Sequence, residues 1–187
     1  MELFFCPDIE NRADVYALLA YSVRQVYSLD NLPAIGRTEH GKPFFVDHLQ
    51  LPFNLSHSGT FALCALDSSP VGVDIEVIRP HHPRLAERIC SPAELAWVTT
   101  QPDPHLALLS LWTKKEARVK QNSCGLTIPL REIAVPLTDA DAVLDGLHFH
   151  ALTGENWVGA VCGHSVPTKI HTIFSAELKK LDTTTSK

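Results

Sequence analysis

The stretch from residue 71 to residue 76 constrains the fold more than any other part of the chain. It reads Val-Gly-Val-Asp-Ile-Glu, so branched apolar residues alternate with a glycine and two acidic residues. Successive side chains of a β-strand point to opposite faces. The pattern therefore predicts a strand that is buried on one face and carries Asp74 and Glu76 together on the other.

The composition is that of a folded protein, because 45% of the 187 residues are hydrophobic and 20% are charged. No apolar run reaches the roughly 18 to 20 residues of a membrane span, and the first residues lack a basic targeting segment. The five cysteines are scattered without a Cys-x-x-Cys pair, which disfavours a disulfide framework and a zinc site. We expect a cytoplasmic protein that is monomeric and does not contact a membrane.

The distribution of charge separates one stretch from the rest. The net charge of −5 disfavours sequence-independent binding of nucleic acid, which needs a basic surface. Between residues 111 and 131, however, only Glu116 opposes five basic residues, which are Lys114, Lys115, Arg118, Lys120 and Arg131. The sequence therefore predicts a local basic face on an acidic protein.

Apolar spacing and turn residues predict an α+β fold. Helices are expected over residues 13–28, from a capping-box sequence at Ser91 and Glu94 onward, and over 104–121, with Gly125 just past the end of the last one. Strands are expected over 44–46, 53–57, 61–66, 71–76, 133–135, 147–152 and 158–162, the second to fourth of them as an antiparallel meander. Each half thus contains a helix followed by strands. We expect a pair of similar subdomains, residues 1–72 and 73–187, with a frayed polar tail from about residue 183.

The helix expected over residues 104–121 carries an acid and a base one turn apart. Glu116 and Lys120 are four residues apart, so they share one helix face, and Trp112 lies four residues earlier on the same stripe. Taken alone, this spacing is more commonly explained by a solvated ion pair beside a core tryptophan.

Three carboxylates are candidates for a metal site. Asp74 and Glu76 leave one strand face together, and Glu116 can join them from the helix. Magnesium prefers oxygen ligands and is commonly held by a few carboxylates together with substrate phosphates. The alternative is the wetted face of an ordinary antiparallel sheet.

The segment Asn-Leu-Ser-His-Ser-Gly at residues 54–59 is a third candidate. Ser56 and His57 are adjacent in a predicted strand, so they point to opposite faces, which argues against a serine nucleophile activated by that histidine. Gly59 permits close approach of a backbone, and the strand end can hold phosphate.

In order and spacing, three segments resemble the motifs of the 4'-phosphopantetheinyl transferases of the surfactin-synthetase-activating type. They are residues 54–59, residues 72–76, and residues 112–120, which read Trp-Thr-Lys-Lys-Glu-Ala-Arg-Val-Lys. Gly-Lys-Pro at 41–43 and Gly-Leu-Thr-Ile-Pro-Leu at 125–130 are also similar, so the resemblance covers about residues 14–162.

The resemblance implies transfer of the phosphopantetheine arm of coenzyme A to a serine of an apo carrier protein, with release of 3',5'-ADP, as in a holo-[acyl-carrier-protein] synthase. It implies a pseudo-twofold pair of α+β subdomains with the site between them. The metal ligands for Mg²⁺ would be Asp74, Glu76 and Glu116. Glu116 and Lys120 would activate the serine and stabilise the diphosphate.

The resemblance also implies contacts with coenzyme A and with the carrier. Lys42, Ser56 and His57 would contact the phosphates and the adenylate end. Fewer residues precede the Gly-Lys-Pro turn than in typical members, and Arg12 is the best candidate to replace their basic residues at the 3'-phosphate. Acyl or peptidyl carriers generally present acidic helices, so the basic face of Lys114, Lys115 and Arg118 would steer docking; a merely solvated helix surface is the alternative.

Two other functions stay open at this point. A magnesium-dependent hydrolase of a nucleotide diphosphate would use the same acids with water as the nucleophile. A noncatalytic paralogue would bind coenzyme A or a carrier protein without turnover. The sequence also leaves open whether the carrier belongs to fatty acid, polyketide or nonribosomal peptide synthesis.

Overall fold

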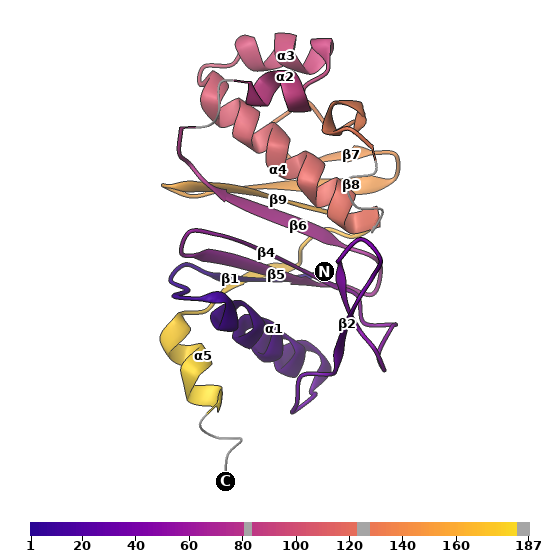
Figure 1. The fold of residues 1–187 in the computed structure, drawn as a ribbon, viewed down its shortest axis with the longest axis vertical. Coiled ribbons are helices and arrows are strands. Elements are labelled where there is room, and N and C mark those ends of the chain that lie inside the picture. The colour runs from indigo at the N-terminus through magenta and orange to yellow at the C-terminus, as the bar shows by residue number, and fades with distance from the viewer. Residues whose placement is uncertain (81–83, 123–127, 183–187) are drawn as a thin grey trace.

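The structure, a computed structural model, describes residues 1–80, 84–122 and 128–182. Two four-stranded sheets lie face to face, and helices cover the outer face of each sheet (Figure 1). The layers therefore run helix, sheet, sheet, helix along the long axis of the molecule.

The first sheet has the strand order β10-β1-β5-β4, where β10 is Lys169–Thr172, β1 is Glu2–Cys6, β5 is Phe61–Leu66 and β4 is Phe53–Ser58. Its outer face is covered by α1 (Arg12–Tyr27) and α5 (Ser175–Asp182), as Figure 1 shows. Leu18, Leu19 and Val23 of α1 are fully buried against this sheet. Their helical spacing is the reason that one stripe of α1 packs inward.

The second sheet has the order β6-β9-β8-β7, where β6 is Gly72–Val77, β9 is Trp157–Gly163, β8 is Leu147–Thr153 and β7 is Ala142–Leu144. The covering helices are α2 (Leu85–Ile89), α3 (Pro92–Thr99) and α4 (Pro104–Asn122). A 3₁₀ turn, Leu130–Glu132, follows them in the chain. A separate hairpin pairs β2 (Ile35–Arg37) with β3 (Pro43–Phe45).

The core between the two sheets explains the alternation in β6. Val71, Val73 and Ile75 are at most 1% exposed and pack against residues of the first sheet such as Leu63. The intervening residues, Gly72, Asp74 and Glu76, face the opposite way, toward α4. The prediction of one apolar face and one acidic face is confirmed.

Most predicted elements are confirmed, with differences in two places. The helices at 13–28 and 104–121 correspond to α1 and α4, and Ser91 and Glu94 form the expected capping box at α3. The expected meander is wrong in its third strand, because β6 pairs with β9 of the second sheet and not with β5. No strand forms over 133–135, where the chain leaves the 3₁₀ turn. Gly125 and the tail from residue 183 lie outside the described residues.

The chain end returns to the first sheet. β10 pairs in parallel with β1, and α5 packs beside α1. The α+β class is as expected. The other strand pairs of the two sheets are antiparallel, so the parallel pairing of β10 makes the first sheet mixed. The division into residues 1–72 and 73–187 stays a prediction, although residues 169–182 pack on the layer formed by the N-terminal residues.

No helix among the described residues is both long enough and apolar enough to cross a bilayer.

Candidate active site

Gly72 lets α4 lie directly on β6. A Cβ atom at this position would be 1.9 Å from the carbonyl oxygen of Ala117 and 2.5 Å from the backbone nitrogen of Gln121. Such distances leave no room for any side chain, so only glycine permits this approach. The close contact brings the last turns of α4, with Glu116 and Lys120, beside the acidic face of β6.

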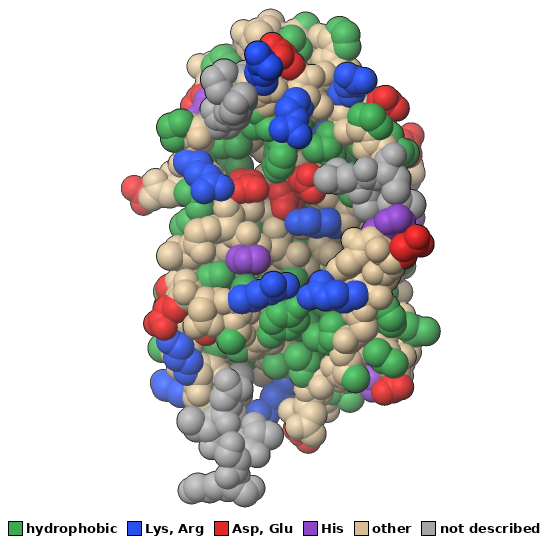
Figure 2. Space-filling view, in the orientation of Figure 1, with side chains coloured by type: hydrophobic (Ala, Val, Ile, Leu, Met, Phe, Trp, Pro, Cys, Tyr) green, Lys and Arg blue, Asp and Glu red, His purple; other side chains and the backbone are tan. Residues whose placement is uncertain are grey.

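The predicted acids and the lysine do converge. Asp74, Glu76, Glu116 and Lys120 line one cavity of about 360 Å³, together with Leu55, Ser56, His57 and Trp112. Figure 2 shows acidic side chains gathered in the middle of one face, between the two halves of the molecule, with basic side chains around them. The site therefore takes residues from α4, β6 and β4.

Asp74 is the most buried acid of the cavity, at 4% exposure. Its Oδ1 accepts hydrogen bonds from Lys120 Nζ (2.6 Å) and Ser56 Oγ (2.8 Å), and Lys120 Nζ also donates to Ser56 Oγ (3.1 Å). Burial raises the pKa of Asp74, while the charge of Lys120 opposes that rise. Lys120 is thus held by the acid with which it shares the cavity.

Glu76 and Glu116 complete the acidic cluster. Glu76 Oε2 accepts a hydrogen bond from Ser58 Oγ at 2.7 Å. Burial raises the pKa of both glutamates, and the negative charge of Asp74 raises both further. Carboxyl groups that repel one another in a partly buried cavity favour a bound cation or proton.

The donor set fits a magnesium ion in its chemistry. Asp74, Glu76 and Glu116 offer only hard oxygen donors, and Asp74 Oδ2 is buried without a hydrogen-bond partner among the described residues. No group of three or more His, Cys, Asp or Glu side chains in residues 1–80, 84–122 and 128–182 is already gathered closely enough to hold a metal ion. Binding would therefore require these side chains to draw together, with Asp74 Oδ2 as a donor that is not yet engaged.

Polar side chains of β4 join the two sheets, and sequence reasoning missed this role. β6 is an edge strand, and its backbone amides at Val73, Ile75 and Val77 receive no strand partner on that side. They donate instead to Asn54 Oδ1 (2.8 Å), Ser56 Oγ (3.4 Å) and Ser58 Oγ (3.2 Å). The signal in the sequence was the alternation of Asn54, Ser56 and Ser58 in one strand.

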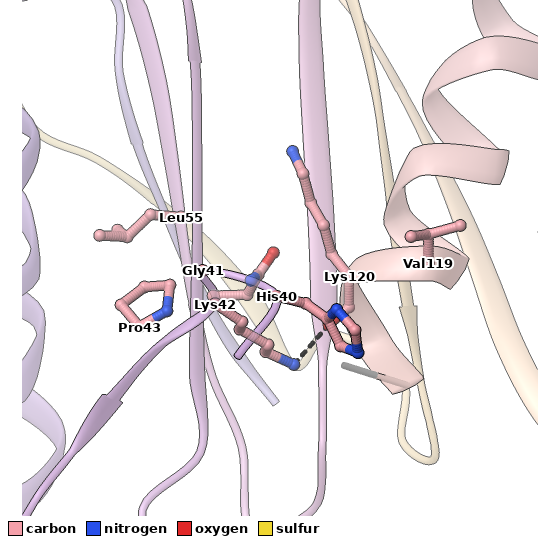
Figure 3. Close-up of a pocket in the computed structure, with 8 residues that line it drawn as sticks. His40, Gly41, Lys42, Pro43, Leu55, Val119 and Lys120 are labelled. Atoms are coloured by element: carbon pink, nitrogen blue, oxygen red, sulfur yellow. Dashed lines mark hydrogen bonds between the residues drawn. The ribbon is translucent and has the colours of Figure 1, made fainter. Parts of the chain in front are cut away.

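The residues expected to contact coenzyme A lie in different places. Ser56 is buried and His57 is exposed, so the two point apart as predicted, and both line the acidic cavity. Lys42 lines an adjoining cavity of about 210 Å³ with Leu55, Val119 and Lys120 (Figure 3). Arg12 is exposed at the start of α1, on the outer face of the first sheet, and does not line the acidic cavity.

The expected basic docking face is wrong for two of its three residues. Lys114 and Lys115 are 2% and 0% exposed. Lys115 Nζ pairs with Glu94 at 2.7 Å and donates to the carbonyls of Leu130 and Ile133, while Lys114 Nζ donates to the carbonyl of Thr138. Arg118 pairs with Asp145 at 2.7 Å. These lysines fasten α4 to its neighbours and offer no surface to a partner.

Comparisons with known proteins match the stretch of the chain that carries most of this cavity. A family model described as the 4'-phosphopantetheinyl transferase superfamily matches residues 70–162, which include β6, α4 and all but the last residue of β9. A 4'-phosphopantetheinyl transferase of Bacillus subtilis is 37% identical over 127 residues, covering 65% of this chain and 56% of the relative.

Two further relatives carry the same description. The transferase Sfp of Bacillus subtilis strain 168 is 37% identical over 101 residues, covering 53% of this chain and 45% of Sfp. The transferase AcpT of Escherichia coli K12 is 45% identical over 100 residues, covering 51% of each chain. This chain spans about half the length of the curated relatives it matches. The matched region carries the converged acids and the lysine, and the chain belongs to the 4'-phosphopantetheinyl transferase superfamily.

Proposed function

We propose that the protein transfers the phosphopantetheine arm of coenzyme A to a serine hydroxyl of an apo carrier protein and releases 3',5'-ADP. The observation that carries this proposal is the convergence of Asp74, Glu76, Glu116 and Lys120 in one cavity between β6 and α4. The names of the relatives support the same activity. The holo-[acyl-carrier-protein] synthase type and a carrier from fatty acid, polyketide or nonribosomal peptide synthesis belong to the proposal, as do a monomeric state and a cytoplasmic location.

Magnesium is the proposed cofactor, and Asp74, Glu76 and Glu116 would hold it. When bound, it supplies positive charge for the diphosphate oxygens. Lys120 supplies a second positive charge from the protein itself, because its ammonium is held at the cavity by Asp74 and Ser56. Charge that is fixed in place before the reaction stabilises the charge that develops on the leaving phosphate oxygen.

Glu116 is the proposed base. It lines the acidic cavity and also a second hollow of about 590 Å³, which it shares with Trp112, so it stands between the two spaces. Burial and the charge of Asp74 raise its pKa, which makes its carboxylate a stronger base than that of an ordinary glutamate. The serine oxygen forms a bond to the phosphorus of the phosphopantetheine arm, the bond from that phosphorus to 3',5'-ADP breaks, and the serine proton passes to Glu116.

The substrate contacts are proposals as well. His57 is exposed at the end of β4 beside the cavity, where an imidazole can reach a phosphate. Ser56 already bonds to Asp74 and Lys120, so it would contact the phosphates next to that lysine. Arg12 remains another proposed contact with coenzyme A. The contact that the resemblance implies for Lys42 competes with the backbone carbonyls that its ammonium group already binds.

Intact-mass spectrometry of apo carriers tests the function. Acyl and peptidyl carriers are incubated with the protein, coenzyme A and magnesium, in parallel with a magnesium-free sample and a carrier whose acceptor serine is replaced by alanine. Gain of one phosphopantetheine arm only on the intact carrier with magnesium supports the proposal. Hydrolysed coenzyme A with unmodified carriers would indicate the hydrolase, and binding of coenzyme A without any turnover would indicate the noncatalytic paralogue.

A further inference from the structure

The side chain of Lys42 extends from the β2–β3 hairpin to the last turn of α4. Its Nζ donates to the backbone carbonyls of Lys120, Gln121 (3.3 Å) and Val71 (3.3 Å). Figure 3 shows the side chain directed toward the last turn of α4, with the hydrogen bond to that turn drawn as a dashed line. The three protons of the ammonium group thus meet three acceptors.

Two of these acceptors belong to a helix end that needs donors. The last four carbonyls of an α-helix have no partner within the helix, and Lys120 and Gln121 lie in the final turn of α4. A cation near this end also interacts favourably with the helix dipole. The third acceptor, Val71, immediately precedes β6. A single side chain therefore ties the end of α4 to the start of the strand that carries Asp74.

Burial of the Lys42 side chain disfavours its charged form. Burial lowers the pKa of Lys42 to about 8. Burial is the only cause of this shift, and no carboxylate of the described residues offsets it. Burying an ammonium group is unfavourable unless hydrogen bonds compensate for the lost hydration. The hydrogen bonds to the backbone carbonyls provide that compensation, so we take these contacts to be the role of Lys42.

The consequence concerns Lys120. Lys42 binds the backbone carbonyl of Lys120, and the side chain of Lys120 reaches Asp74 Oδ1 at 2.6 Å. We propose that Lys42 is a positioning residue that holds the last turn of α4 against β6 and so places the Lys120 ammonium at Asp74. This role differs from the phosphate contact that the family resemblance implies, and its kinetic part rests on the proposed transferase function.

Hydrogen exchange tests the structural part without any activity assay. In Lys42→Met, the amides of residues 119–122 are expected to exchange about tenfold faster or more than in the wild type, because the turn loses its donors. Amides of β8 and β9 should keep their rates. Lys169→Met is the control. It removes an exposed lysine from β10, which forms the edge of the first sheet opposite to β4. Unchanged exchange at 119–122 would overturn the proposal whether or not the protein is a transferase.

Lys42→Arg is a second variant that tests the proposal if Lys42→Met does not fold. Arginine keeps the charge, but its planar fork does not reproduce three bonds converging on one nitrogen. The same local increase in exchange is expected, in a chain whose β8 and β9 amides remain protected. If all amides of Lys42→Arg exchange at wild-type rates, three hydrogen bonds from a single nitrogen are not needed to hold the turn. That result would contradict the proposal.

Kinetics separate positioning from direct contact. If Lys42 positions Lys120, Lys42→Met lowers kcat by about 10- to 100-fold and leaves the KM for coenzyme A unchanged. The ratio of kcat/KM between coenzyme A and 3'-dephospho-coenzyme A then stays at its wild-type value. A raised KM with wild-type kcat, or a lost preference for the 3'-phosphate, would assign Lys42 to the substrate and reject positioning.

Discussion

Ser56 Oγ donates a hydrogen bond to Asp74 Oδ1 at 2.8 Å, and it accepts one from Lys120 Nζ at 3.1 Å. One hydroxyl group therefore contacts both the most buried acid of the site and the lysine beside it. Because Ser56 belongs to the first sheet and Asp74 to the second, this contact also fixes the two halves of the molecule relative to each other at the active site.

Ser56→Ala removes this hydroxyl while keeping the strand. We expect transfer to fall by about 10- to 100-fold, because groups that orient a metal ligand typically contribute that much. Asp74 Oδ1 would keep its hydrogen bond from Lys120 and lose the one from Ser56. Steady-state rates with an apo carrier measure the effect, and wild-type kcat in this variant would contradict the orienting role.

Glu116→Gln separates activity from stability. Transfer is expected to fall by about 100-fold or more, because an amide cannot accept the serine proton. The metal-free variant should nevertheless melt at a higher temperature than the wild type near neutral pH, because it no longer places a charged carboxylate next to Asp74 and Glu76.

The stability gain should depend on pH. The pKa of Glu116 is raised in the folded state above its ordinary 4.5 by burial and by Asp74. The stability that goes with a raised pKa is present below the unfolded value and is lost as the pH rises through the folded value. The advantage of Glu116→Gln in EDTA should thus be small near about pH 4 and increase toward about pH 8. Magnesium should raise the melting temperature of the wild type more than that of the variant. A variant that is less stable than the wild type at the higher pH would argue against this account.

Gly72→Ala tests the close packing of α4 on β6. The new Cβ would collide with the backbone at Ala117 and Gln121, so we expect a loss of about 3 kcal/mol or more in the free energy of unfolding. Urea denaturation measures it. Gly163→Ala is the matched control, because its Cβ would approach within 3 Å only the flexible end of the Met1 side chain, at 2.7 Å. Equal losses in the two variants would show that the contact with α4 is not responsible.

Lys115→Met tests the corrected role of the buried lysine. Removing it leaves Glu94 charged and buried at 6% exposure, and breaking a buried ion pair from one side typically costs about 3–5 kcal/mol. The double variant Lys115→Met/Glu94→Leu should recover part of that loss. The KM of Lys115→Met for the carrier should match that of the wild type. A selective increase in that KM would instead identify Lys115 as a docking residue.

Local patterns predicted the part of the site that lies within single elements. Alternation in one strand placed Asp74 and Glu76 on a shared face, and helical spacing placed Glu116 and Lys120 on another. These arrangements depend on backbone geometry alone, so a sequence reveals them. The family resemblance then indicated that the two faces would meet.

Contacts between distant segments could not be predicted in this way. Lys115 looks solvated in a basic stretch, and its burial follows from Glu94 on α3 and from carbonyls near residue 130. The step of β6 into the second sheet and the pairing of β10 with β1 likewise depend on the assembled layers. Periodicity carries no information about which strands become neighbours.

Side chains of β4 accept hydrogen bonds from the backbone amides of β6, and this affects self-association. An edge strand with free amides is a template on which another copy can add a strand and begin to polymerise. Asn54, Ser56 and Ser58 occupy those amides and leave no row of donors for a second chain. The polar groups that arrange the acids of the site therefore also keep this edge from aggregating, so disabling them would endanger solubility along with activity.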